Sequence, residues 1–209
     1  MGEEIKGVII VDAFKRVSQT LIDESDYLTS LDQAIGDGDM GINMERIGRA
    51  LMEYSNTTVI SDIGNYLINA GMITNKVAPS TMGTLIAIAL LRAGKEVKGK
   101  SELLMLDLST ILKSTFDAIQ ERGKANIGDK TILDALLPAY KAFDKAVNAG
   151  KNLQESGLLA LRAAEEGRDK VTPLKSKIGR ASWVGDRSVG NIDPGCALIV
   201  AIFSSLLNT

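Results

Sequence analysis

Apolar residues recur at intervals of three and four positions through most of the chain, and no long stretch alternates apolar with polar residues. The first spacing gathers apolar side chains on one face of an α-helix, whereas alternation is typical of a half-buried strand. The pattern therefore predicts an all-α fold. The expected helices span residues 3–22, 25–35, 41–54, 58–73, 80–94, 101–122, 130–148, 152–170 and 194–207.

The connections between these segments are short and carry Gly, Asn, Pro or Lys. Short connections make successive helices antiparallel, so we expect an up-and-down bundle or barrel of about eight helices in a single domain over 1–209. Residues 84–91 and 196–207 are almost continuously apolar, but each is shorter than the roughly 20 residues that span a bilayer. We expect core helices there and no membrane contact. Pro138 should kink its helix or end it locally.

Composition and charge exclude several classes of function. The chain has no histidine, so it builds neither a Ser-His-Asp triad nor a phosphohistidine relay. Its single cysteine, Cys196, rules out an intramolecular disulfide and any Cys-rich metal site. A formal net charge of -2, without a dense Lys/Arg cluster, argues against nucleic acid as a partner. Because the first residues are also unlike a signal peptide, we expect a cytoplasmic protein.

The segment from Asp32 to Met44 carries the most informative motif. Asp32, Asp37 and Asp39 are interleaved with glycines at 36, 38 and 41. Carboxylates this close repel one another unless a cation lies among them, and hard oxygen ligands favour Mg²⁺ or Ca²⁺. A helix that begins near Gly41 would direct free N–H groups at an anion beside the metal. The motif predicts a metal-phosphate site.

The same segment also admits a structural interpretation, because Asp and Gly are common in surface turns. An EF-hand that began at Asp37 would need a side-chain oxygen at its fifth position and Glu at its twelfth. Gly41 and Gly48 occupy those positions, so an EF-hand is excluded. The choice between a turn and a metal site therefore depends on the other loops at the same end of the bundle.

Alternate loops of an up-and-down bundle share one end, so separate connections can supply groups to one site. Ser80 and Thr81 stand at an expected helix start, where their hydroxyls either cap that helix or contact a phosphate. Residues 122–132 form a polar turn between long helices. Asp129 is the expected cap of the helix that follows this turn.

Residues 179–195 form a long irregular segment that contains the only tryptophan. Structureless loops of this length are uncommon in compact domains and are usually functional. Arg180 and Arg187 either neutralise phosphate oxygens or belong to a solvated loop. Asp193 and Pro194 are expected to be the cap and first residue of the last helix.

Three of these segments, taken in order, resemble the DhaL family, the nucleotide-binding subunits of dihydroxyacetone kinase, along nearly the whole chain. They are Leu31–Met44, Arg122–Thr131 and Gly179–Gly195. The family fold is a barrel of eight antiparallel helices with the nucleotide at one end. The resemblance implies the same fold here, in agreement with the helical pattern.

The resemblance also implies roles for individual residues. Asp32, Asp37 and Asp39 would hold two Mg²⁺ ions that bridge the nucleotide phosphates, and with Arg180 they would form the catalytic set. Met40 takes the place of a histidine that is usual in the family. The residues expected to contact the nucleotide are Met40, Gly41, Ile42, Asn43, Ser80, Thr81, Gly123, Ile132, Arg180, Asp193, Pro194 and Gly195.

The implied activity is a kinase reaction that needs a partner subunit. Phosphate would pass from Mg-bound nucleotide to dihydroxyacetone, or a related ketose, held by a DhaK-like subunit. A chain without a substrate domain favours the phosphotransferase-linked branch, in which ADP is a bound coenzyme that a DhaM-like subunit rephosphorylates; ATP is the other donor. The alternative is a diverged nucleotide-sensing regulator that binds a transcription factor, without catalysis. A homodimer is a further expected assembly.

Overall fold

The computed structural model describes residues 4–207, which are almost entirely helical. Two short strands, β1 (Glu4–Lys6) and β2 (Glu102–Leu104), and two 3₁₀ turns, η1 (Arg180–Ser182) and η2 (Gly185–Ser188), accompany the helices. The α-helices of the described residues are α1 (Gly7–Asp23), α2 (Ser25–Ile35), α3 (Met40–Thr57), α4 (Ile63–Val77), α5 (Thr81–Glu96), α6 (Met105–Gly123), α7 (Leu133–Asn148), α8 (Leu153–Val171) and α9 (Pro194–Leu207).

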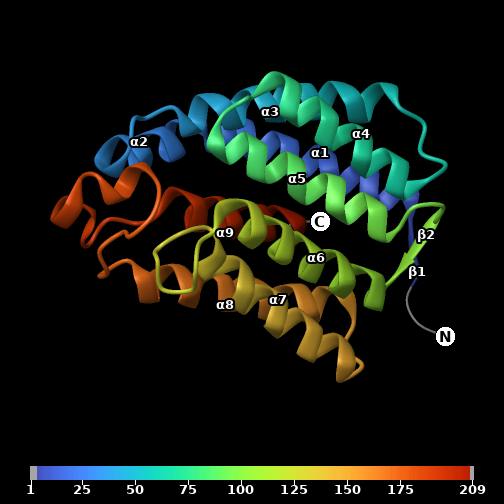
Figure 1. The fold of residues 1–209 in the computed structure, drawn as a ribbon. Helices are drawn as coiled ribbons and strands as arrows, with labels where there is room; N and C mark the ends of the chain where they lie inside the picture. Colours follow the sequence, from blue (N-terminus) through green and yellow to red (C-terminus); the bar gives the residue numbers. More distant parts are fainter. Residues whose placement is uncertain (1–3, 208–209) are drawn as a thin grey trace.

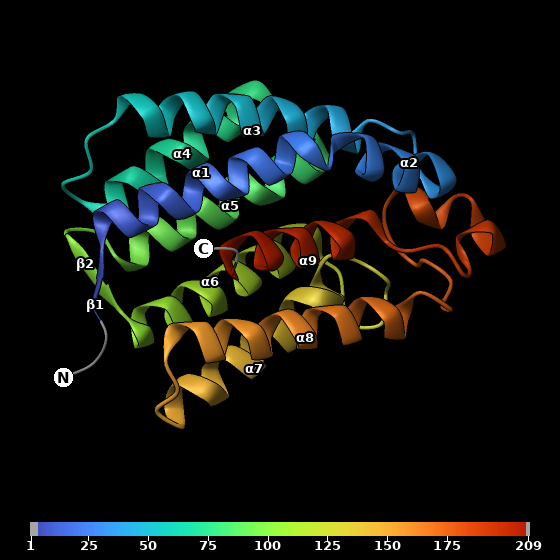
Figure 2. The ribbon, with the colours of Figure 1, turned by 180° about the vertical axis from the view of Figure 1, so that it is seen from behind.

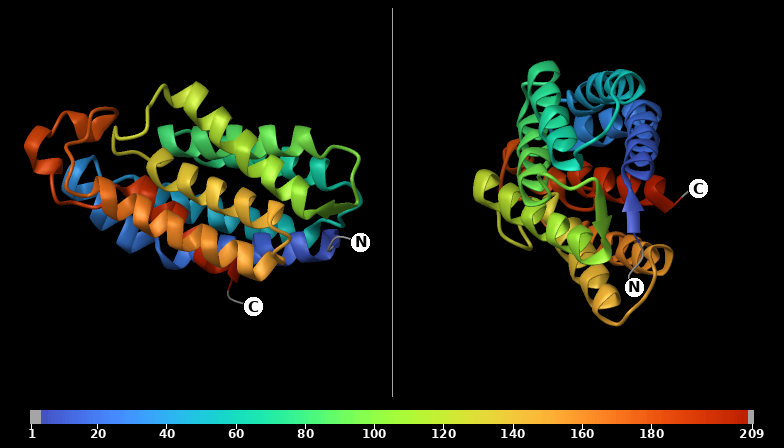
Figure 3. Two further views of the ribbon diagram at one scale, coloured as in Figure 1. Left: turned by 90° about the horizontal axis from the view of Figure 1, so that it is seen from below. Right: turned by 90° about the vertical axis from the view of Figure 1, so that its right-hand side faces the viewer.

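The long helices form a closed barrel. In chain order α3, α4, α5, α6, α7, α8 and α9 each contact the next, and α1 contacts both α3 and α9, which closes the ring. Neighbours run in opposite directions (Figure 1), and the end-on view in Figure 3 shows them around a common axis. The short α2 does not form part of the barrel wall but lies at one end of the barrel (Figure 2). The all-α, up-and-down prediction is therefore confirmed, with eight long helices and one short one.

Two predicted helix starts are wrong because each includes a short strand. Residues 4–6 pair antiparallel with residues 102–104, Glu4 opposite Leu104 and Lys6 opposite Glu102. Ile5 and Leu103 point inward and are buried. Three residues are too few to give a visible alternation, so helical periodicity on either side hid both strands. Residue 3, where the first helix was expected to begin, lies outside the described residues.

A third predicted start is wrong for a capping reason. The fourth helix was expected from residue 58, but α4 begins at Ile63. Asp62 has extended backbone, and its side chain accepts a hydrogen bond from the Asn65 N–H at 3.0 Å. A carboxylate that satisfies a free N–H of the first turn fixes where the helix starts. The last helix, in contrast, begins and ends at the predicted residues.

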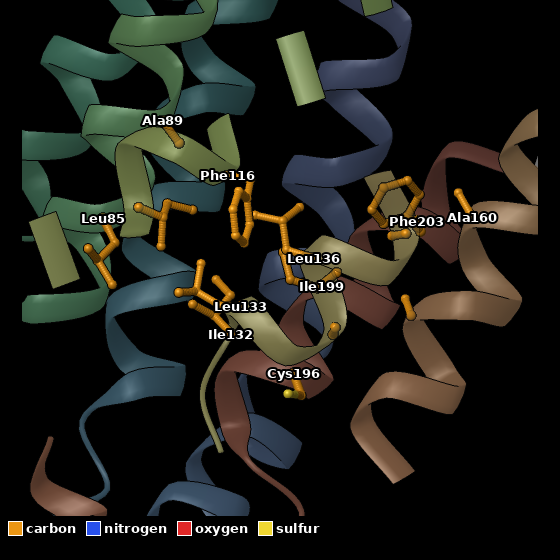
Figure 4. Packing of buried hydrophobic residues seen from close by; sticks show 14 of the residues in the cluster. Leu85, Ala89, Phe116, Ile132, Leu133, Leu136, Ala160, Cys196, Ile199 and Phe203 are labelled. Carbon is orange, nitrogen blue, oxygen red and sulfur yellow. The ribbon is translucent and has the colours of Figure 1, made fainter. Parts of the chain in front are cut away.

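The interior is lined by aliphatic side chains from every side of the barrel. Figure 4 shows one group of them, in which Leu85 of α5, Phe116 of α6, Leu136 of α7 and Ile199 of α9 share one space. Between α1, α5, α6 and α9 the barrel also encloses an apolar cavity of about 450 Å³. In the described residues, no helix is both long enough and apolar enough to cross a membrane.

Four connections lie at the barrel end that α2 occupies, and β1 and β2 lie at the opposite end (Figure 1). These connections are 36–39, 78–80, 124–132 and 172–193. Their convergence follows from the up-and-down topology, as the sequence predicted. These connections and the helix ends next to them contain the candidate site residues.

Candidate functional site

The three aspartates of the first motif lie together. Asp32 is in the last turn of α2, and Asp37 and Asp39 are in the loop to α3. One carboxylate oxygen from each lies within 4.8 Å of the others. The loop is closed by a hydrogen bond from the Met40 N–H to Asp32 Oδ2 at 3.2 Å, and Gly38 has a φ of 76°, in the left-handed region. The turn therefore brings the carboxylates onto one side of the α3 N-terminus.

This donor set fits a hard divalent cation. Three carboxylates at this separation supply the oxygen ligands that Mg²⁺ and Ca²⁺ take, and all three are at least partly exposed to solvent. Arg180 of η1 makes an ion pair with Asp37. Arg180 comes from a segment far along the chain, so charged groups of both signs from separate segments meet at these carboxylates.

Two glycines of the motif are required by close packing. A side chain at Gly36 would collide with the Asp32 carboxylate, and one at Gly41 would collide with the Ser25 carbonyl oxygen of α2. Gly41 thus lets α3 begin directly against α2. Asn43 donates from Nδ2 to the Asp39 carbonyl oxygen at 2.9 Å, which fixes the first turn of α3.

The first turn of α3 divides its residues between core and surface. Met40 is 6% exposed and packs into the core, so only its backbone faces the loop. Ile42 is half exposed at the same helix start. At this helix start the Ile42 side chain is therefore exposed, while the Met40 N–H is bonded to Asp32.

Ser80 and Thr81 stand at the start of α5. Ser80 accepts a hydrogen bond from the Gly83 N–H at 3.1 Å and so caps the helix. Thr81 is the first helical residue and is exposed. Within residues 4–207, no hydrogen bond or ion pair joins either residue to the aspartate loop. Of the two sequence interpretations, the structure realises capping for Ser80.

The connection from α6 to α7 differs from its prediction. Asp129 does not cap α7; its carboxylate accepts from the Asn126 N–H at 2.7 Å, and α7 begins later, at Leu133. The reason is Lys130, whose φ of 64° places it in the left-handed region, outside any helix. Gly123 ends α6, and the following residue is also left-handed.

Asp134 is a site-shaping residue that the sequence analysis missed. Its side chain is buried and accepts hydrogen bonds from the Gly128 N–H at 2.5 Å and the Thr131 N–H at 2.8 Å. The Thr131-to-Asp134 spacing matches the [ST]-x-x-[DE] pattern that precedes helices. That pattern was the available signal.

The segment around η1 and η2 reaches back over the site end. Its Arg180 contacts Asp37, whereas Arg187 is exposed. Trp183 is 87% exposed. Lys130, the other residue that the sequence analysis missed, is 1% exposed and donates to carbonyl oxygens of this segment. No local sequence pattern predicts these bonds, because the acceptors lie 42 to 58 residues further along the chain.

The start of α9 packs against the start of α7. Asp193 accepts a hydrogen bond from the Cys196 N–H at 2.8 Å, so the predicted cap is confirmed, and Pro194 is the first helical residue. Burial raises the pKa of the Asp193 carboxyl to about 6. A Cβ on Gly195 would come within 3.0 Å of the Ile132 Cβ, so these two candidate residues are in contact.

Comparison with known proteins identifies the family of this chain. The DAK2 domain family matches residues 34–208. A Listeria innocua protein described as PEP-dependent dihydroxyacetone kinase 2, ADP-binding subunit DhaL, is 35% identical over 82% of this chain and 80% of its own length. The corresponding Escherichia coli K12 subunit is 29% identical over 94% of both chains.

A solved structure has the same fold. The dihydroxyacetone kinase of C. freundii, in complex with AMP-PNP and Mg²⁺, superposes with a TM-score of 0.76 at 24% identity. The match covers 99% of this chain and 35% of that longer one. From the family match and the DhaL relatives together, we conclude that the chain belongs to the DAK2 domain family.

Proposed function

We propose that this protein is the nucleotide-binding, phosphate-transferring subunit of a dihydroxyacetone kinase. The observation that carries the proposal is the meeting of Asp32, Asp37 and Asp39 with Arg180 at the N-terminus of α3. A concentration of carboxylates and a guanidinium at a helix start suits a nucleotide whose phosphates carry divalent metal. Relatives described as ADP-binding DhaL subunits support the assignment.

The three aspartates are the proposed ligands of two Mg²⁺ ions. When bound, the metals offset the charge of the phosphate oxygens and help to align donor and acceptor. Arg180 supplies a forked set of donors for phosphate oxygens, and its contact with Asp37 holds it beside them. The free first-turn N–H groups of Gly41 and Ile42 offer further donors. The Asn43 N–H already donates to the Asp39 carbonyl oxygen at 3.1 Å, so Asn43 would contact the nucleotide through its side chain.

The other candidate residues would bind the rest of the nucleotide. Ser80 and Thr81 lie at the second helix start of this end, and Gly123 and Ile132 would line the base pocket. Asp193, Pro194 and Gly195 close the site through the contact of Gly195 with Ile132. Met40 takes part only through its backbone.

A partner must hold the acceptor, because positioning and charge are all that this chain offers to the reaction. It has no histidine that could hold the substrate covalently or carry a phosphoryl group. We therefore place dihydroxyacetone, or a related ketose, on a DhaK-like subunit, and propose ADP as a bound coenzyme recharged by a PEP-linked donor of the DhaM type. The relatives are kinase subunits, so they do not favour the alternative of a nucleotide-sensing regulator.

The test is replacement of Asp37 by Asn, which keeps the side-chain shape and removes the charge. We expect the wild-type protein, denatured after purification, to release adenine nucleotide and Mg²⁺, and to transfer phosphate when mixed with a DhaK-type subunit and a PEP-linked donor system. Asp37→Asn should lose transfer and metal while retaining the helical circular dichroism. The matched control is Asp26→Asn, an exposed aspartate in the first turn of α2. Full transfer by Asp37→Asn would refute the proposal.

A further inference from the structure

Lys130, in the connection from α6 to α7, carries a charged side chain that is 1% exposed. Its Nζ donates hydrogen bonds to the carbonyl oxygens of Thr172 at 2.8 Å, Leu174 at 2.9 Å and Ser188 at 2.5 Å. An ammonium group has three protons, so these acceptors use all of them. No salt bridge to Lys130 occurs within the described part of the chain. Carbonyl dipoles contact its charge directly, and the Asp193 carboxylate acts on it without a salt bridge.

The three acceptors belong to the two ends of one segment. Thr172 and Leu174 follow α8, and Ser188 ends η2, so a single ammonium ties the ends of residues 172–188 together. Other bonds reinforce this junction. Ser188 Oγ accepts from the Ser176 N–H at 3.0 Å, and the Lys177 N–H donates to the Asp129 carbonyl oxygen at 3.1 Å.

Arg180 lies in the part of the segment between these anchors. Its contact with Asp37 is an ion pair between partly exposed groups, and such pairs contribute little by themselves. The flanking backbone is permissive, since Gly179 and Gly185 have positive φ. Most of the order of this loop must therefore come from its ends, where the buried bonds are.

A lysine suits this junction better than other residues. An apolar side chain would remove the donor to the Leu174 carbonyl oxygen. The carbonyl oxygens of Thr172 and Ser188, which also accept from the N–H groups of Gly190 and Asn191, would each have one donor fewer. The planar fork of arginine does not match three acceptors around one point, whereas an ammonium does. Burial lowers the pKa of the Lys130 ammonium, because the charged form is desolvated. The hydrogen bonds at the junction offset this desolvation.

We propose that Lys130 is a positioning residue: by tying both ends of segment 172–188 to the α6–α7 connection, its ammonium holds Arg180 beside the aspartate loop. It does not touch the nucleotide and acts only through Arg180. The consequence for nucleotide affinity rests on the proposed function, whereas the consequence for the order of the loop does not.

The first experiment is a double-mutant cycle on Mg-ADP affinity, measured by calorimetry. If Lys130 acts through Arg180, Lys130→Met and Arg180→Ala should each weaken binding by about tenfold, and the double variant should be no more than about twofold weaker than the weaker single variant. Losses that multiply in the double variant would overturn the proposal. Lys175→Met is the matched control, because Lys175 pairs with Asp186 on the surface of the same segment and should change affinity less than about twofold.

The second experiment needs no nucleotide. Amide hydrogen exchange of Ser176 and Gly190, whose N–H groups bond within the junction, should be at least about tenfold faster in Lys130→Met, while amides of α4 keep their rates. Unchanged exchange at the junction would overturn the proposal. Should Lys130→Met fail to fold, Lys130→Gln, which keeps an amide donor, is judged by the same outcomes. A wild-type protein that fails to bind Mg-ADP would refute the proposed function, yet exchange would still decide the role of Lys130.

Discussion

Two features of Asp193 have opposite effects on the pKa of its carboxyl group. As the cap of α9 it accepts the Cys196 N–H, an interaction that favours the charged carboxylate. It is also 8% exposed, and burial raises its pKa from 3.8 to about 6. The raising effect prevails because burial is the largest influence on this pKa; Asp134 adds a like charge, and Lys130 offsets that charge only in part. Ionised Asp193 is thus a cost to the folded state at neutral pH.

Replacing Asp193 by Asn should therefore stabilise the protein at neutral pH. Between pH 3.8 and about 6 the folded state keeps a proton that the unfolded chain releases, so the stability that this group contributes falls as pH rises through that window. Asn keeps an oxygen for the Cys196 N–H and does not ionise. The variant should gain up to about 3 kcal/mol over wild type at pH 7 and little at pH 4.

Urea unfolding of both proteins at pH 4, 5, 6 and 7 measures this difference. Asp186→Asn serves as the control, because that side chain is 93% exposed and should leave stability nearly unchanged. A gain for Asp193→Asn that is the same at every pH, or a loss that grows toward pH 7, would contradict the assigned burial effect.

At the scale of elements, α7 and α8 pack closely where Pro138 of α7 lies opposite Gly167 of α8. Pro138 lies inside α7 without ending it, and it has no N–H for the Asp134 carbonyl oxygen. Gly167 of α8 lies against that carbonyl; a Cβ there would collide with it and would come within 2.8 Å of Pro138 Cγ. The helix contact therefore depends on the absence of a side chain at position 167.

Gly167→Ala should destabilise the protein even though alanine is the better helix former. Helix propensity alone favours alanine by about 1 kcal/mol, whereas the collision with a backbone atom should cost more, for a net loss of about 1 to 3 kcal/mol in urea unfolding. Gly157→Ala in the same helix is the control, because a Cβ there meets only the movable end of Leu207. Equal stability of the two variants would contradict this account.

Helix existence was predictable from the sequence because apolar spacing and caps are local. Asp193 and Pro194 placed the start of α9 correctly. Predicted boundaries and caps were wrong where a non-local or backbone effect decided the structure. Lys130 took a left-handed conformation to reach distant carbonyls, which delayed α7 and left Asp129 without its predicted role as cap. The strand from Glu4 to Lys6 depended on a partner almost a hundred positions away.

At the scale of the whole molecule, the aspartate motif could be predicted, but the contacts that join separate loops at the site could not. The motif is local, so its clustered carboxylates were visible in the chain. The contact of Arg180 with Asp37 and that of Ile132 with Gly195 depend on which loops share a barrel end. The up-and-down topology predicts which loops share that end, but the contacting residue pairs can be identified only when the side chains are placed.

The barrel should unfold as one cooperative unit, which tests the prediction of a single domain. Its buried side chains form three groups, one around Phe116 and Leu136, one around Met44 and Leu198, and one around Ile5 and Leu103. Met82 packs against the first two groups, and Phe14 and Leu90 join the second to the third. Because these side chains connect the three groups, calorimetry should show one transition with equal calorimetric and van't Hoff enthalpies. Two resolved transitions would contradict a single domain.

Leu90→Ala sharpens this test, because it removes a side chain that two groups of the core share. In one cooperative unit the lost packing lowers the free energy of unfolding of the whole barrel, so the temperature of the single transition should fall by roughly 5 to 10 °C without splitting. Leu106→Ala, at a side chain that is 59% exposed, should move it little. If Leu90→Ala instead separated the transition into two, the groups would be independent, and the site end could then open without unfolding the strand end.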